Sequence, residues 1–110
     1  MSDIRQAGKA LVVRILEGDG EASRALRRGA FDNAGLVEPV RTLVQKLTIH
    51  ADKVTDEDIT AAGASGLSQD QIFEIVVCAA VGEATRQYDT ALATLRVVAE
   101  RSGYAPGDPR

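Results

Sequence analysis

SQDQIFEIVVCAAVGEATRQYDTALATLRVVAE, residues 68–100, is the stretch that decides the fold. Ser68 and Gln71 fit the S-x-x-Q capping box, in which each side chain satisfies a backbone N–H at the start of a helix. From Gln69 to about Glu100 only Gly82 interrupts a helical pattern. Because an isolated glycine weakens a helix without necessarily ending it, the stretch predicts one long helix, or two with a kink near Gly82.

The two halves of this predicted helix differ in their apolar pattern. IFEIVVCAAV, residues 72–81, is apolar nearly all round, and we expect it to be the buried centre of the fold. The second half is amphipathic, through Ala84, Tyr88, Ala91, Leu92, Leu95 and Val98. The apolar surface exceeds what one small core needs, so we expect a partner subunit to cover the excess and predict a homo-oligomer.

Four shorter helices are predicted upstream from apolar spacings of three and four residues. They span residues 3–17, residues 21–31, residues 37–51 with Pro39 near the start, and a segment that begins after Thr55 and ends at GASG, residues 63–66. Thr55 can cap the fourth helix, with acids in its first turn. The sequence thus predicts a single all-α domain of about five helices over residues 1–100, followed by a flexible tail, residues 101–110.

The composition fits one small globular domain. The chain has 110 residues and no Trp, so its core must be built from Ala, Val, Leu and Ile. A net charge of −3 opposes nucleic-acid binding, which relies on Lys and Arg. Arg24, Arg27 and Arg28 form a local basic cluster, which we interpret as a solvated helix face; the alternatives are an anion contact and a subunit salt bridge.

The sequence also predicts a cytoplasmic protein without a membrane segment. Cys78 is the single cysteine, so no disulfide can form within the chain. The first 13 residues lack the pattern of a signal peptide. IVVCAAV, residues 75–81, is the longest apolar run and is far shorter than the ~20 residues that cross a bilayer.

Candidate chemistry gathers in HADKVTDED, residues 50–58, which holds the sole histidine, His50. A metal site would need two or three further convergent ligands. The neighbouring acids cluster instead at one predicted helix start, and no spacing matches a metal-ligand pattern. We therefore predict neither a metal nor a cofactor.

Two residues of the predicted long helix carry reactive groups. Glu74 interrupts the apolar run, and a carboxylate there needs a partner or becomes protonated. It could be a general base, an ion-pair partner of an Arg, or an exposed side chain; we favour the ion pair or the exposed side chain over the general base. Cys78 has apolar neighbours, and we expect a buried, inert thiol. Glu83 and Arg86, three residues apart, can form an ordinary surface pair.

VTDEDITAAGASGLSQDQIFEIVVCAAVGEATRQYDTALATL, residues 54–95, resembles the alkyl hydroperoxidase D-like and carboxymuconolactone decarboxylase superfamily. There a short helix leads to a Gly-Leu-Ser/Thr-x-x-x-Ile turn, here GLSQDQI, and a long Ala-rich helix follows. The upstream stretch ALRRGAFDNAGLVEPVRTLVQKLTIHADKV, residues 25–54, is similar to a subgroup, so the resemblance covers about residues 16–98. It implies an all-α fold that assembles into oligomers.

In the peroxidase branch the resemblance implies a motif of Glu, then Cys-x-His-Cys, then His. Without gaps, the last His falls on Asp58, the two cysteines on Ala51 and Val54, the His between them on Lys53, and the Glu on Pro39, next to Glu38. A peroxidatic cysteine must form a thiolate, a sulfenic acid and then a disulfide. None of these residues can do so, and we expect no dithiol peroxidase activity.

The decarboxylase branch needs acid/base residues and groups that hold a carboxylated lactone. Arg41, His50 and Arg86 are the candidates for holding the negative charge. The function we predict is a non-redox, non-catalytic oligomer that binds a partner or a small molecule. The alternatives are a cofactor-independent lyase or isomerase that uses His50, Glu74 or Asp58, and a helical interaction module outside this superfamily.

Overall fold

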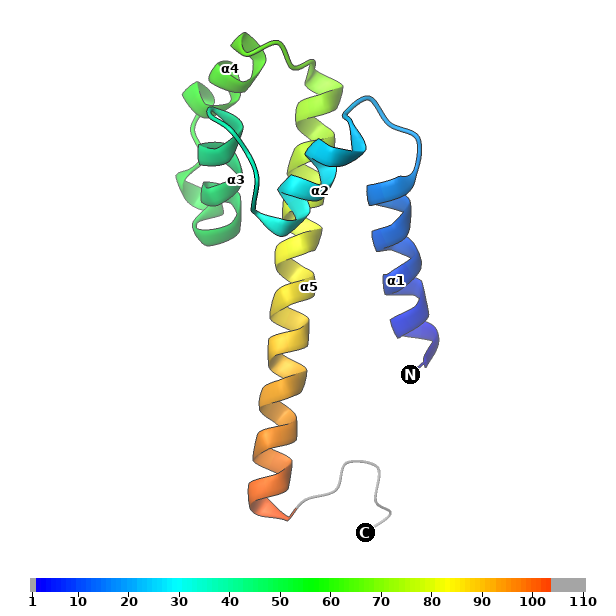
Figure 1. Ribbon diagram of the computed structural model, residues 1–110. Coiled ribbons are helices and arrows are strands. Elements are labelled where there is room, and N and C mark those ends of the chain that lie inside the picture. Colours follow the sequence, from blue (N-terminus) through cyan, green and yellow to red (C-terminus); the bar gives the residue numbers. More distant parts are fainter. Residues whose placement is uncertain (1, 104–110) are drawn as a thin grey trace.

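The computed structural model describes residues 2–103, with side chains from residue 6 onward. Within that range the fold is all-α, as predicted, with five α-helices and one 3-10 turn (Figure 1). The elements are α1 (Ser2–Glu17), α2 (Arg24–Asp32), α3 (Val40–Ile49), η1 (Ala51–Lys53), α4 (Asp56–Ala64) and α5 (Gln69–Ser102). No helix in this range is long and apolar enough to cross a membrane. Most of the tail predicted at residues 101–110 lies outside the described residues.

The long helix α5 is continuous. The predicted capping box is confirmed, because Ser68 Oγ accepts from the Gln71 N–H at 3.1 Å and Gln71 Oε1 accepts from the Ser68 N–H at 2.8 Å. The helix continues through Gly82 to Ser102, so of the two predicted alternatives the single long helix is correct. At 1.5 Å per residue, its 34 residues span about 50 Å.

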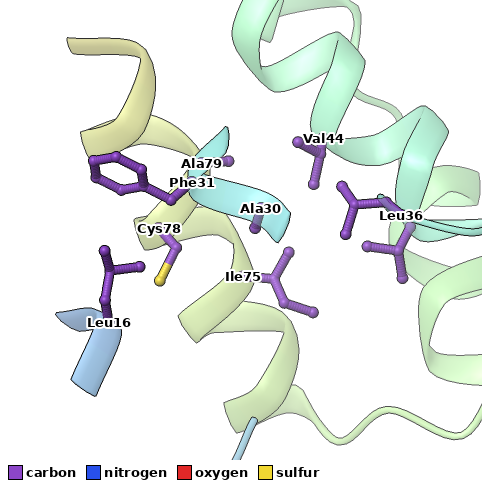
Figure 2. Close-up of a cluster of buried hydrophobic side chains, with 9 residues drawn as sticks. Leu16, Ala30, Phe31, Leu36, Val44, Ile75, Cys78 and Ala79 are labelled. Carbon is purple, nitrogen blue, oxygen red and sulfur yellow. The ribbon is translucent and has the colours of Figure 1, made fainter. Parts of the chain in front are cut away.

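Helix α2 crosses α5 at Gly82, and this contact organises the core. A Cβ at position 82 would overlap the backbone carbonyl of Phe31, so only glycine lets α2 approach this closely. Arg86, one turn further along α5, donates from Nη1 to the same Phe31 carbonyl oxygen. The main core cluster surrounds the crossing (Figure 2) and consists of Leu16, Ala30, Phe31, Leu36, Val40, Val44, Ile75, Cys78 and Ala79.

Helices α3 and α4 cover the first turns of α5. A second buried cluster joins the three helices through Leu43, Ala62 and Ile72. Thr55 caps α4 as predicted, because its Oγ1 accepts from the Asp58 N–H at 3.3 Å. The core is therefore mostly aliphatic, as the composition predicted, with Phe31 as its aromatic member.

Two predicted helices are shorter in the structure. The helix predicted at residues 37–51 is α3, which begins at Val40, and the Glu38 carboxylate accepts from the Thr42 N–H in its first turn at 2.9 Å. The chain leaves α3 at His50 and forms the 3-10 turn η1. The helix predicted at residues 21–31 begins only at Arg24, where Ser23 is the N-cap.

The first half of α5 is not buried all round, contrary to our expectation. Ile75 and Ala79 are fully buried, but the Phe73 side chain is 68% exposed. The C-terminal end of α5 extends beyond the other helices (Figure 1), and the Leu95 side chain is 62% exposed. The physical reason is that α2, α3 and α4 gather on one side of α5, and α1 makes few contacts with it.

Candidate functional site

The three candidate catalytic residues lie on different elements. His50 is the C-cap residue of α3 and is exposed. Asp58 lies in the first turn of α4, and Glu74 lies in the second turn of α5. The contacts of Asp58 and of Glu74 show what each carboxylate does.

Asp58 holds α3 and α4 together. Its carboxylate accepts from Lys46 Nζ at 2.8 Å and from the Thr55 N–H at 2.9 Å. The Lys46 hydrogen bond, with the Thr55 N–H next, lowers the pKa of the Asp58 carboxyl below its usual value of 3.8. A carboxylate that is ionised and occupied in this way serves the helix start and the α3–α4 contact.

Glu74 anchors the loop between α1 and α2 to α5. Its two carboxylate oxygens accept from the Glu21 N–H at 2.8 Å and from the Ala22 N–H at 3.1 Å. These donors, with a smaller contribution from the Arg27 charge, lower the pKa of Glu74 below its usual value of 4.5, while burial opposes them. A general base works best with a pKa near the operating pH, so this geometry favours the structural role.

Arg27 lies beneath the same loop and is only 5% exposed. Its Nη1 donates to the Ile15 carbonyl at 3.1 Å and to the Gly18 carbonyl at 2.7 Å, which satisfies acceptors at the C-terminal end of α1. Its Nε is buried without a hydrogen-bond partner among the described residues. The prediction of a solvated face is thus wrong for Arg27, whereas Arg24 and Arg28 are exposed.

Cys78 lies close to the charged groups of Arg27 and Glu74. The thiol is buried, and Sγ lies 3.8 Å from the Ile15 carbonyl oxygen. Burial raises the pKa of Cys78 above its ordinary value of 9.0, and the Arg27 charge opposes this only in part. The predicted burial of Cys78 is thus confirmed, and a buried neutral thiol is a poor nucleophile.

A cleft of about 520 Å³ opens between α1, the α1–α2 loop and α5. Its lining consists of Leu11, Arg14, Ile15, Asp19, Gly20, Glu21, Arg27, Asp70, Phe73, Glu74, Val77 and Cys78. The lining combines apolar side chains, such as Ile15, Phe73 and Val77, with six charged side chains. Glu74 belongs to this lining, but His50 and Asp58 do not.

The predicted anion-holding residues do not converge on the cleft either. Arg41 Nε donates to the Leu36 carbonyl at 3.1 Å. Arg86 is engaged by the Phe31 carbonyl and by Glu83, whose carboxylate lies 3.6 Å away, as predicted for this pair. Within residues 2–103, no three His, Cys, Asp or Glu side chains are grouped so that they could hold a metal ion.

Comparison with known proteins gives no match, either among family models, among curated proteins or among solved structures. The residues themselves therefore carry the argument about function. Sequence reasoning missed the cleft and the burial of Arg27. The available signal was the short GDG loop, which brings α2 back beside α1 and hence an α2 arginine to the end of α1.

Acid is expected to destabilise the fold through Glu38, Asp58 and Glu74. Hydrogen bonds to Thr42 lower the pKa of Glu38, as Lys46 and the loop amides do for the other two carboxyls. Because the folded-state pKa values are depressed, the contribution is complete above about pH 5 and is lost as the pH falls through the folded values. Urea unfolding between pH 7 and pH 3 measures it.

The control for this pH dependence is Glu74→Gln, which retains the side-chain size but removes the titrating carboxylate. We expect the variant to be less stable than wild type at pH 7 and to lose less stability on acidification. An acid slope equal to that of wild type would show that Glu74 does not contribute.

Proposed function

We propose that this protein is a non-redox, non-catalytic homo-oligomer of the carboxymuconolactone decarboxylase-like superfamily that acts as a binding or interaction protein. The order of elements supports the family proposal. A short helix, α4, leads through the Gly-Leu-Ser turn at residues 66–68 into the long Ala-rich helix α5. This is the arrangement that the resemblance implies.

The roles of the chemically reactive side chains support a non-catalytic function. Asp58 joins two helices, Glu74 anchors a loop, and Cys78 packs in the core. Ala51 and Lys53, at two of the peroxidase motif positions, lie on the exposed turn η1 and offer no thiol. Asp58, Glu74 and Cys78 thus have structural roles in the fold, and His50 is exposed at the end of α3.

The observation that carries the proposal is the uncovered apolar surface of α5. Phe73, Tyr88, Leu95 and Val98 are all more than half exposed. Exposed apolar patches of this kind mark interaction surfaces, because monomers seldom leave such area in water. The alternative lyase would be favoured by a pocket that joins His50 to Glu74, and His50 is not part of the cleft that contains Glu74.

Light scattering at micromolar concentration tests the proposal, and we expect a mass well above the 11.7 kDa of one chain. A hydroperoxide-reduction assay with excess dithiol is expected to show no turnover above the rate without protein. A monomeric protein would contradict the oligomer, and turnover that disappears in Cys78→Ala would contradict the absence of redox activity.

A further inference from the structure

Two opposite faces of α5 have different environments. The face that carries Ile75, Ala79, Gly82 and Arg86 contacts α2, and most of it is buried. At 100° per residue, the opposite face carries a stripe with spacings of three and four residues. This stripe, called the outer stripe below, consists of Phe73, Val77, Ala80, Ala84, Tyr88, Ala91, Leu95 and Val98.

The outer stripe runs along most of α5. From Phe73 to Val98 it covers about 38 Å at 1.5 Å per residue. Five of its residues are apolar and larger than alanine or are aromatic, namely Phe73, Val77, Tyr88, Leu95 and Val98. Its upper end continues into the cleft, because Phe73 and Val77 line both, and α1 adds the half-exposed Leu11. One occupant could therefore cover the stripe and fill the cleft.

We infer that this occupant is the α5 helix of a second copy of the chain, packed antiparallel along the outer stripe. The inference rests on the proposed oligomer and specifies its interface. The register sets Phe73 opposite Val98, Val77 opposite Leu95, Ala80 opposite Ala91, and Ala84 opposite Tyr88 of the second copy. Each pair occurs twice, as a two-fold interface requires.

Side-chain sizes favour the antiparallel direction. In this register the bulky Tyr88 meets the small Ala84, and only the pair of Ala80 and Ala91 places two small side chains opposite each other. A parallel pair would place Tyr88 against Tyr88 and Ala84 against Ala84. The two tyrosines would then hold the helices apart and leave gaps where alanine faces alanine. Close-packed interfaces avoid such gaps.

Charges favour the same direction. The cleft is lined by four carboxylates, those of Asp19, Glu21, Asp70 and Glu74, and by two arginines, Arg14 and Arg27. The antiparallel register brings Arg96 of the second copy level with Val76, beside these carboxylates. In a parallel pair Arg96 would stay about 30 Å from the cleft. Opposite charges that meet across an interface set its orientation.

The arrangement also gives α1 a partner. Leu92 and Arg96 lie on the side of α5 that turns toward α1 of the other copy in this register. The Leu11 side chain, half exposed in one copy, would pack against Leu92 of the second. Each chain thus supplies two helices to a four-helix arrangement, which buries more apolar area than two isolated helices could.

Leu95→Glu tests the stripe, with Val97→Glu as a matched control. Val97 is also exposed, at 45%, and lies two residues away on a different face of α5. By light scattering we expect wild type and Val97→Glu to have an even multiple of 11.7 kDa, and Leu95→Glu to fall at least twofold in mass. Far-UV circular dichroism checks that both variants remain helical.

Cysteine cross-linking tests the direction. In a Cys78→Ala background, Val77→Cys and Leu95→Cys proteins are mixed, one of them isotopically labelled, and oxidised. The antiparallel register predicts disulfides between the two variants, whereas a parallel pair would give disulfides within each variant.

The outcomes separate this inference from the proposed function. A wild-type monomer would overturn both. A wild-type oligomer that Leu95→Glu leaves intact, that has an odd number of chains, or that cross-links only within each variant would overturn the interface alone.

Discussion

Gly82→Ala is expected to lower the free energy of unfolding by about 3 kcal/mol, at the upper end of the cost of overpacking. The added Cβ would overlap the Phe31 carbonyl oxygen and lie 2.8 Å from the Phe31 carbonyl carbon. Both neighbours are backbone atoms, so no side-chain rotation can relieve the clash. Helix α2 would have to move away from α5 and would give up the Arg86–Phe31 hydrogen bond. Urea denaturation followed by circular dichroism measures the loss.

Gly8→Ala is the matched control for this prediction. Gly8 lies within α1, and a Cβ there would meet no atom within 4 Å. Because alanine favours the helix over glycine by roughly 0.5–1 kcal/mol, Gly8→Ala should be neutral or stabilising. Equal losses in the two variants would mean that the α2–α5 contact is not the reason.

Arg27→Ala is expected to cost about 3 kcal/mol, because hydrogen bonds from a charged group contribute roughly 1.5–3 kcal/mol each and the two lost here share one donor atom. The substitution would leave the Ile15 and Gly18 carbonyls at the end of α1 without their donor. It would also leave a cavity beneath the α1–α2 loop. Since α1 has few other contacts with the fold, we expect it to detach first, and hydrogen exchange of the α1 amides should detect this.

Arg28→Ala provides the comparison at the adjacent position. The Arg28 side chain is 60% exposed and pairs with Asp32 at 3.2 Å on the surface. Exposed pairs of this kind contribute at most about 1 kcal/mol. If Arg27→Ala and Arg28→Ala had similar effects on stability, the role assigned to Arg27 would be wrong.

The contrast between these two arginines matters for the proposed function. Arg27 and Glu74 fix the α1–α2 loop, and this loop with α1 forms one wall of the cleft. Loss of either residue should therefore weaken the proposed assembly indirectly. The outer stripe can be altered at Leu95 without touching this wall, which makes Leu95→Glu the more direct test of assembly.

The sequence by itself determined the helices. Capping residues such as Thr55 and Ser68 act on amides three residues away, and apolar spacing is a local property, so both can be read without the fold. The starts of α4 and α5 were predictable for this reason, whereas the sequence left open whether α5 is continuous or kinked near Gly82. The burial of Cys78 followed from its apolar neighbours.

Only the tertiary structure decided which sides of those helices are covered. Arg27 and Arg28 are neighbours of the same chemical type, and the closeness of α1 buries the first of them. Phe73 belongs to the most apolar run, yet α2, α3 and α4 gather on the other side of α5 and leave it exposed. Helix packing depends on contacts between residues far apart in the chain, such as Phe31 with Gly82 and Glu74 with Glu21. Local sequence patterns do not specify such contacts. The long-range contacts produced the cleft and left the outer stripe uncovered.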